Sequence, residues 1–285
     1  MPLVPTRELV SKAAAAGRAV AAFNVITLEH AEAITAGAAA AGAPGVILQI
    51  SENAVAHHGS LAPLAAAART ALEAARVPAA LHLDHATRPE LVEEAVALGF
   101  TSVMYDGAAL PWAENVAYTR RIAHHCREHG VFLEAELGEI GGKDGAHAPG
   151  VRTDPREAAR FVVDTGVDAL AVAVGTSHHM TERTARIDLE LVRELRAAVP
   201  VPLVLHGSSG ADDATLAAAA GAGIRKINIS THLDTVFTAA VREVLEAGPV
   251  VDPRRYVSRG REAMAAEVAR LLRLFASSLP VPAAS

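Results

Sequence analysis

The sequence is poor in residues on which several classes of protein depend. Cys126 is the one cysteine among 285 residues. The chain can therefore form neither an internal disulfide nor a thiolate cage around a metal, which fits a reducing cytoplasm. Aromatic residues make up 4% of the chain, and the formal net charge is -6 at pH 7. Nucleic-acid-binding proteins need a basic surface and aromatic rings for stacking, so we expect no nucleic-acid partner.

Long hydrophobic runs are also missing. No uninterrupted apolar stretch reaches the roughly 20 residues that a membrane-spanning helix needs. A signal peptide would be apolar near the N-terminus, but charged residues interrupt that segment at Arg7, Glu8, Lys12 and Arg18. We therefore expect a soluble, cytoplasmic protein with no membrane partner.

What the sequence does contain is a regular alternation of two patterns. Continuous apolar runs, typical of strands buried on both faces, are each followed by a helical stretch. The predicted strands are 19–26, 45–51, 78–85, 102–107, 131–137, 169–175, 202–206 and 226–230. The predicted helices are 6–17 before the first strand, then 28–41, 61–75, 89–98, 112–129, 154–165, 189–198 and 214–220 between consecutive strands, with further helices after the last strand.

Eight strand–helix units without a low-complexity linker predict a TIM barrel, formed by residues 1–285 as a single domain. A small-residue tail from about Ser277 is expected to be disordered. The alternative is a doubly wound open sheet. That fold favours a Gly-x-Gly-x-x-Gly turn after the first strand, and residues 24–27 offer none.

Histidines stand at the ends of three predicted strands. His85 closes the motif Leu81-His82-Leu83-Asp84-His85, His178 follows the sixth strand, and His206 ends the seventh. The carboxyl ends of barrel strands meet at one rim. One such histidine alone would be read as structural. Three imidazoles that leave a fourth position open are the arrangement that holds a catalytic zinc.

Two acidic residues end the neighbouring strands. Asp106 follows the fourth strand and Glu136 lies at the end of the fifth. They could orient the histidines, hold a second metal, or form a salt bridge at the rim. The loops after strands seven and eight, 207–210 and 228–231, are rich in glycine and hydroxyl residues. Such loops expose backbone N–H groups, and TIM barrels commonly bind phosphate there.

The chain resembles the class II, zinc-dependent ketose-bisphosphate aldolases, the family that includes fructose- and tagatose-bisphosphate aldolases. The resemblance covers nearly the whole chain. It is carried by Phe23-Asn24-Val25, His82-Leu83-Asp84-His85, Ser102-Val103-Met104-Tyr105-Asp106-Gly107, Glu134-Ala135-Glu136-Leu137-Gly138, Gly141-Gly142, Leu205-His206-Gly207-Ser208-Ser209 and Asn228-Ile229-Ser230-Thr231.

This resemblance implies a metal site and a catalytic acid. Zinc would bind His85, His178 and His206, and Asp106 and Glu136 would form an alternative metal position. A second divalent or a monovalent cation could also bind. Asp84 would donate a proton to the aldehyde.

The resemblance also implies a substrate pocket. Dihydroxyacetone phosphate would lie against Gly207, Ser208 and Ser209 and against Asn228, Ile229, Ser230 and Thr231. Asn24 and Ser51 would line the same pocket. Arg261 resembles the family arginine that reaches the distal phosphate of a neighbouring subunit, so a homodimer or homotetramer is expected.

Two residues depart from the family pattern. His179 stands where the family usually has a glycine that helps to hold the substrate phosphate or a monovalent cation. An imidazole there would change how phosphate binds. Asp144, after Lys143, stands where a mobile loop usually carries the glutamate that moves the substrate proton. Its side chain is one methylene shorter, so the loop would have to close further.

The reaction implied is reversible cleavage of a phosphorylated ketose, of the ketose 1,6-bisphosphate type, into dihydroxyacetone phosphate and an aldehyde through a metal-stabilised enediolate. A Schiff-base mechanism is not favoured, because Lys12, Lys143 and Lys226 lack a suitable setting and Lys226 begins a strand. A zinc hydrolase on the same barrel is one alternative, although the first strand ends in Asn24 and not in His-x-His. A non-catalytic sugar-phosphate-binding subunit is the other.

Overall fold

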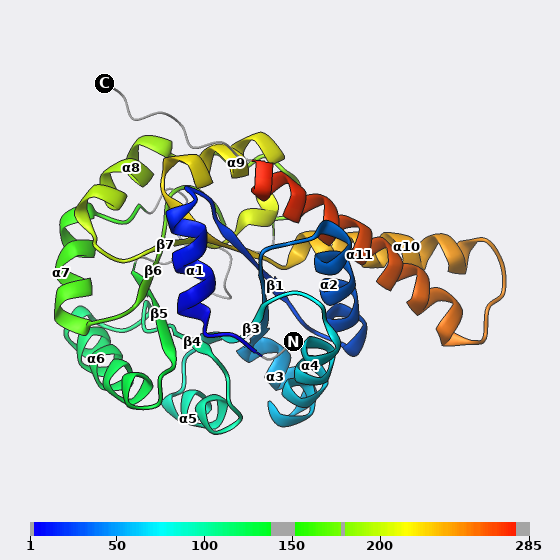
Figure 1. Ribbon diagram of the computed structural model, residues 1–285, viewed down its shortest axis with the longest axis horizontal. Helices are drawn as coiled ribbons and strands as arrows, with labels where there is room; N and C mark the ends of the chain where they lie inside the picture. Colours follow the sequence, from blue (N-terminus) through cyan, green and yellow to red (C-terminus); the bar gives the residue numbers. More distant parts are fainter. Residues whose placement is uncertain (1–2, 138–151, 178–179, 278–285) are drawn as a thin grey trace.

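The computed structural model describes residues 3–137, 152–177 and 180–277. Its strands form a closed, all-parallel barrel in the order β1 to β8, which confirms the predicted TIM barrel (Figure 1). The strands are β1 Val20–Asn24, β2 Val46–Ser51, β3 Ala79–Ala86, β4 Ser102–Tyr105, β5 Phe132–Leu137, β6 Ala169–Val172, β7 Leu203–Leu205 and β8 Ile224–Ile229. The expected loop with Asp144 and the tail after Ser277 lie outside the described residues.

Helices cover the outside and one end of the barrel (Figure 1). They are α1 Thr6–Ala15, α2 Leu28–Ala41, α3 Glu52–His58, α4 Ala62–Ala74, α5 Pro89–Ala97, α6 Trp112–Glu128, α7 Pro155–Thr165, α8 Leu189–Ala198, α9 Asp213–Ala222, α10 Thr231–Glu246 and α11 Pro253–Ser277, with the short 3-10 helix η1 Ser208–Gly210. Among the described residues, no helix is both long and apolar enough to cross a membrane.

The barrel has two different ends. Helix α1 lies across the amino ends of the strands, where the Thr6 hydroxyl donates a hydrogen bond to Ser102 Oγ at the start of β4 (2.8 Å). Because α1 covers the amino ends, the open end of the barrel, which we call its mouth, lies at the carboxyl ends of the strands. Helices α10 and α11 pack against each other and extend to one side of the barrel, and α11 also packs along α2 (Figure 1).

Polar residues occupy the interior of the barrel at alternate strand positions. Side chains alternate between the two faces of a strand, so Glu134 and Glu136 of β5 face the same side, as do Lys226 and Asn228 of β8. The side chains of Gln49, Glu134 and Lys226 are at most 1% exposed. Burying charged groups is costly unless they are paired, so these positions indicate a polar network beneath the mouth.

Helix α3 was not predicted. It has only seven residues, too few to show a helical repeat of apolar positions. Its ends nevertheless carry helix signals. The Ser51 side chain accepts a hydrogen bond from Ala54 N, and Gly59 ends the helix with a left-handed φ of 75°. The helix matters because it begins directly after β2, at the rim of the mouth.

Candidate active site at the carboxyl end of the barrel

A cavity of about 500 Å³ opens at the carboxyl ends of the strands. Its walls come from the ends of β1, β2, β3, β4, β7 and β8 and the loops that follow them. The expected site residues among its lining are Asn24, Ser51, Asp84, His85, Asp106, His206, Gly207, Ser208, Ser209, Asn228, Ser230 and Thr231. Ile229 is buried in the hydrophobic core and does not line the cavity.

An irregularity in β3 directs two consecutive side chains into the cavity. In a regular strand Asp84 and His85 would point to opposite faces. The pairing with β4 instead jumps from Leu83–Val103 to Ala86–Tyr105, which inserts one extra residue into β3. His85 absorbs this bulge with a left-handed φ of 51°, and no other non-glycine residue in the described part of the chain has a positive φ. That conformation costs about 1–2 kcal/mol.

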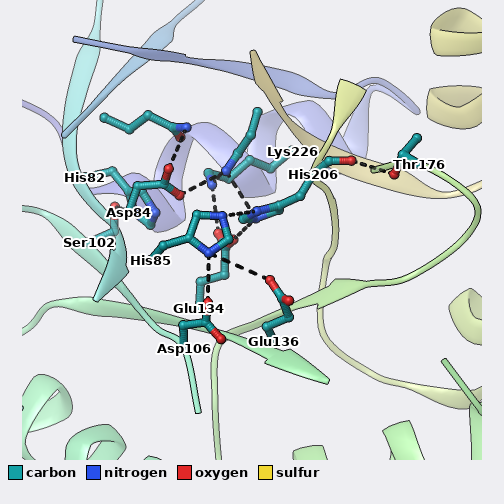
Figure 2. Close-up of polar contacts among 12 residues, drawn as sticks. His82, Asp84, His85, Ser102, Asp106, Glu134, Glu136, Thr176, His206 and Lys226 are labelled. Carbon is teal, nitrogen blue, oxygen red and sulfur yellow. Dashed lines mark hydrogen bonds and ion pairs between the residues drawn. The ribbon is translucent and has the colours of Figure 1, made fainter. Parts of the chain in front are cut away.

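The two described histidines of the predicted zinc site meet in the cavity (Figure 2). His85 Nε2 and His206 Nδ1 are 2.9 Å apart. The second nitrogen of each ring contacts a carboxylate: His85 Nδ1 is 3.0 Å from Asp106 Oδ2, and His206 Nε2 is 2.8 Å from Glu134 Oε1. Metal-binding histidines are oriented in this way by carboxylates. The donor set therefore fits a zinc ion.

The acidic residues extend this set. Ligand atoms of Asp84, His85 and His206 lie within 4.8 Å of one another, as do those of His85, Asp106 and Glu136. His85 belongs to both groups, and its Nδ1 is 3.8 Å from Glu136 Oε2. Two neighbouring metal positions that share His85 are thus compatible with the side chains present.

The carboxylate of Asp84 is held by three amide groups. Oδ2 accepts hydrogen bonds from Asn24 Nδ2 and Gln49 Nε2, both at 3.3 Å. Oδ1 accepts from Asn228 Nδ2 at 3.2 Å. Burial opposes ionisation, but the positive charges of His85, His206 and Lys226 outweigh it and lower the pKa of Asp84. Asp84 is therefore ionised at neutral pH. Gln49 has no role in the sequence-based prediction, although it is a polar residue within the apolar run Val46–Ile50 of β2.

The prediction that Lys226 begins a strand and lacks a specific setting is wrong. The residue does not begin its strand, since β8 starts at Ile224, and it has a specific setting inside the barrel. Nζ donates to Glu134 Oε2 at 2.8 Å and to Asn228 Oδ1 at 2.7 Å (Figure 2). The other oxygen of Glu134 contacts His206. Lys226 does not line the cavity, so it supports His206 through Glu134 and is not presented to the cavity.

His82 lies deeper in the same interior. Its Nδ1 is 2.8 Å from Ser102 Oγ, and the side chain is fully buried. Burial, reinforced by the charge of Lys226, lowers the pKa of His82 well below its usual value. His82 is therefore neutral at pH 7 and forms part of the floor of the site, separate from the histidines that meet at the mouth.

The opposite side of the cavity carries groups suited to an anion. Gly207 has a left-handed φ of 65°, and a Cβ atom there would lie 2.6 Å from the Ser177 carbonyl oxygen, so the turn requires glycine. Helix α10 begins at Thr231, and Ser230 and Thr231 line the cavity. A helix N-terminus favours negative charge. Ser209 Oγ accepts a hydrogen bond from His232 N at 3.1 Å, which leaves the Ser209 proton available to another acceptor.

Four further expected site residues are not seen at this cavity, three because the structure does not describe them. His178, His179 and Asp144 are outside the described residues. The residues just before His178 do pack on the end of β7, since Thr176 Oγ1 donates to the His206 carbonyl at 2.7 Å. Arg261, on α11, forms an ion pair with Glu32 and does not line this cavity.

Comparisons with known proteins agree with this geometry. A family model described as "Fructose-bisphosphate aldolase class-II" matches residues 4–279. A Bacillus subtilis protein described as a probable fructose-bisphosphate aldolase is 38% identical over 98% of this chain and 99% of its own length. A fructose-bisphosphate aldolase from Geobacillus stearothermophilus is 37% identical over 98% of both chains.

Solved structures show the same relationship. The crystal structure of the YdjI aldolase from Escherichia coli K12 superposes with a TM-score of 0.85, at 31% identity over 98% of both chains. A putative fructose-1,6-bisphosphate aldolase from Coccidioides immitis superposes with the same TM-score of 0.85, at 30% identity over 96% of both chains. The chain belongs to the class-II fructose-bisphosphate aldolase family, a family of lyases.

Proposed function

We propose that this chain is a zinc-dependent aldolase that reversibly cleaves a phosphorylated ketose, of the ketose 1,6-bisphosphate type, into dihydroxyacetone phosphate and an aldehyde. One observation carries the proposal. The pair His85–His206 and the ionised Asp84 lie in the same cavity as the N-terminus of α10. A donor set for a metal, a group that moves protons and an anion site are thus combined in one pocket.

We assign zinc to His85 and His206, with His178 as the third ligand on the strength of the family resemblance. When bound, zinc would supply Lewis-acid polarisation of a substrate carbonyl. Asp106 contacts His85 Nδ1, and Glu134 contacts His206 Nε2. These contacts fix the orientation of the two rings. Asp106 and Glu136 would serve a second cation position around His85.

The proton chemistry falls to two carboxylates in this proposal. Asp84 takes the hydroxyl proton during cleavage and returns it to the aldehyde oxygen during condensation, and its three amide partners fix the direction from which it does so. Asp144, by resemblance to the family loop, would move the carbon-bound proton of dihydroxyacetone phosphate.

The phosphate of the donor would bind between η1 and the start of α10, where Ser208, Ser209, Ser230 and Thr231 line the cavity. Asn24 and Ser51 would contact the sugar hydroxyls from the opposite wall. His179 would alter the phosphate pose relative to the glycine that is usual in the family. A cytoplasmic homodimer or homotetramer, in which Arg261 serves a neighbouring pocket, completes the proposal.

A cleavage screen tests this assignment. Purified protein with measured zinc content is incubated with fructose and tagatose bisphosphates and with ketose 1-phosphates, and released triose phosphate is the readout. We expect stoichiometric zinc and turnover of at least one bisphosphate, both abolished by a chelator. Protein that holds zinc but releases no triose phosphate from any ketose phosphate would contradict the aldolase assignment.

A further inference from the structure

The conformation of His85 needs support from outside its own strand. The pairing of β2 with β3 runs residue by residue from Val46–Ala79 to Ser51–Asp84 and stops there. The next step would pair Glu52 with His85. A left-handed residue cannot continue a parallel ladder, and His85 has a φ of 51°.

A side chain takes over where the ladder ends. Glu52 Oε2 accepts hydrogen bonds from Thr87 N at 2.6 Å and from Thr87 Oγ1 at 3.0 Å. Glu52 Oε1 accepts from Arg88 Nε at 2.6 Å. We name these three hydrogen bonds the Glu52 clamp. They fix the backbone two residues after His85.

The other side of the same segment is fixed by β4. Ala86 pairs with Tyr105, and the Ala86 carbonyl accepts a hydrogen bond from Asp106 N at 2.8 Å. The residues after His85 are therefore held between the Glu52 clamp and β4. Without the clamp, the segment would lose the support on its β2 side that opposes relaxation of the left-handed conformation.

We propose that Glu52 is a positioning residue for the metal site: through Thr87 and Arg88 it holds β3 in the bulged form that aims His85 at His206. This inference rests on the proposed metal function of His85. Glu52 is well placed for the role, because it is the first residue of α3 and the Ser51 cap fixes the start of that helix. Burial opposes its ionisation, but the hydrogen bonds from Thr87 and Arg88 lower the pKa of Glu52 and keep the clamp charged.

The test measures zinc affinity directly, by competition with a chromophoric chelator, in the folded full-length chain. We expect Glu52→Ala to weaken zinc binding by about 10- to 100-fold, the usual effect of losing a residue that orients a metal ligand. Arg88→Ala removes a single bond of the clamp without touching the cavity wall, so we expect a smaller loss in the same direction. Cobalt-loaded Glu52→Ala should also show a shifted ligand-field spectrum.

Glu157→Ala is the matched control, because Glu157 is also an acidic residue in the first turn of a barrel helix but is exposed and away from the cavity. It should leave zinc affinity and the cobalt spectrum unchanged. If Glu52→Ala fails to fold, Glu52→Gln and Arg88→Ala carry the same test. Glu52→Gln keeps an acceptor for Thr87 but presents an amide to Arg88, so an intermediate loss is expected.

Two outcomes overturn the inference in different ways. Wild-type zinc affinity and an unchanged cobalt spectrum in Glu52→Ala and Arg88→Ala would show that Glu52 does not position His85, whatever happens to substrate binding. A wild-type chain that binds no zinc and cleaves no ketose phosphate would overturn the proposed function, and this inference with it.

Discussion

At the scale of single residues, the surroundings of Asp84 suit the proposed transfer of a proton in both directions. Its pKa is lowered, although burial alone would raise it, by the charges of His85, His206 and Lys226. The carboxylate is thus ready to accept a proton, as the proposed cleavage step requires. Its three amide contacts keep both oxygens in place for the return of the proton.

The first prediction separates the two proposed acids. Asp84→Ala should lose cleavage and condensation by about two to four orders of magnitude, the usual contribution of a positioned general acid. It should still exchange the carbon-bound proton of dihydroxyacetone phosphate with solvent deuterium, because the proposal assigns that step to Asp144. Asp144→Ala should lose exchange and condensation together. NMR of dihydroxyacetone phosphate in deuterium oxide, alongside cleavage kinetics, makes the measurement.

Zinc content serves as the control for both variants. If Asp84→Ala keeps its zinc and loses exchange, or if Asp144→Ala exchanges normally, this division between the two carboxylates is wrong.

The second prediction concerns the buried ion pair Lys226–Glu134. Lys226→Met leaves the Glu134 carboxylate buried with His206 as its described partner, and such an uncompensated charge costs about 3–5 kcal/mol of unfolding free energy. The double variant Lys226→Met, Glu134→Gln removes the charge and should recover part of that loss. Denaturant unfolding followed by circular dichroism measures both. Equal stability of the wild type and Lys226→Met would show that the pair is not coupled to folding.

The polar residues inside the barrel also show which features of the site could be predicted from the sequence. The strand-end position of His85 and His206 could be read from the chain, because any barrel brings such positions to one rim. The period of two placed Glu134 and Glu136 on one face. The contact between Lys226 and Glu134 could not be read, because β5 and β8 are not neighbours in the barrel and meet only across its interior.

At the scale of elements, the sequence predicted where strands run but not where their ladders end. Strands β6 and β7 were expected over 169–175 and 202–206 but end at Val172 and Leu205. The apolar runs continue further, since Ala173 and Val174 are buried. Their backbones leave the ladder at the mouth, where loops build the site. An apolar pattern indicates that residues are buried but not whether their backbones pair with a neighbouring strand. The carboxyl ends of β6 and β7 therefore could not be predicted from the sequence.

A third prediction lies at this scale, where α10 meets α11. Glu267 of α11 contacts His232 Nε2 at 2.6 Å and Arg270 Nη2 at 2.7 Å. Burial opposes its ionisation, but the hydrogen bonds from Arg270 and His232 lower the pKa of Glu267 to about 2. A lowered acid pKa adds stability above the unfolded-state pKa of about 4.5, and the gain is lost as pH falls toward 2.

Glu267→Gln should therefore lower the free energy of unfolding at pH 7 by about 1–2 kcal/mol, after allowance for solvent screening. The difference from the wild type should shrink as the pH is lowered below 4.5. Urea unfolding at several pH values tests this. Glu262→Gln is the matched control, since Glu262 forms an exposed pair with Arg259 on the same helix. A pH-independent difference for Glu267→Gln would contradict the electrostatic explanation.

At the scale of the whole molecule, the barrel followed from the sequence because eight repeats of one unit leave few other ways to bury so many apolar strands. The placement of α10 and α11 did not follow. These helices come after the last strand; α11 packs on α2, near the other end of the chain, and α10 packs on α11. Their sequence predicts helices but not a direction in space, and it is on α11 that Arg261 lies.

The fourth prediction asks whether one subunit completes the site of another. Arg261 pairs with Glu32 and is absent from the lining of its own cavity. If it serves a neighbouring pocket as proposed, Arg261→Ala should raise the Michaelis constant for a bisphosphate about tenfold or more, because it removes one charge-assisted contact with phosphate. The constant for a ketose 1-phosphate should change little. Arg259→Ala, an exposed arginine two residues away, is the control and should leave both constants unchanged.

Mixed oligomers then decide whether the contact is made between subunits. Asp84→Ala subunits have no working site but keep Arg261. Arg261→Ala subunits have a working site that lacks its arginine. After the two are dissociated and reassembled together, each hybrid should contain a complete site, formed by the catalytic groups of one subunit and the Arg261 of the other. Bisphosphate cleavage at low substrate should therefore exceed the sum of the two parents. Activity equal to that sum would place Arg261 outside any shared site, because hybrid assembly would then have restored nothing.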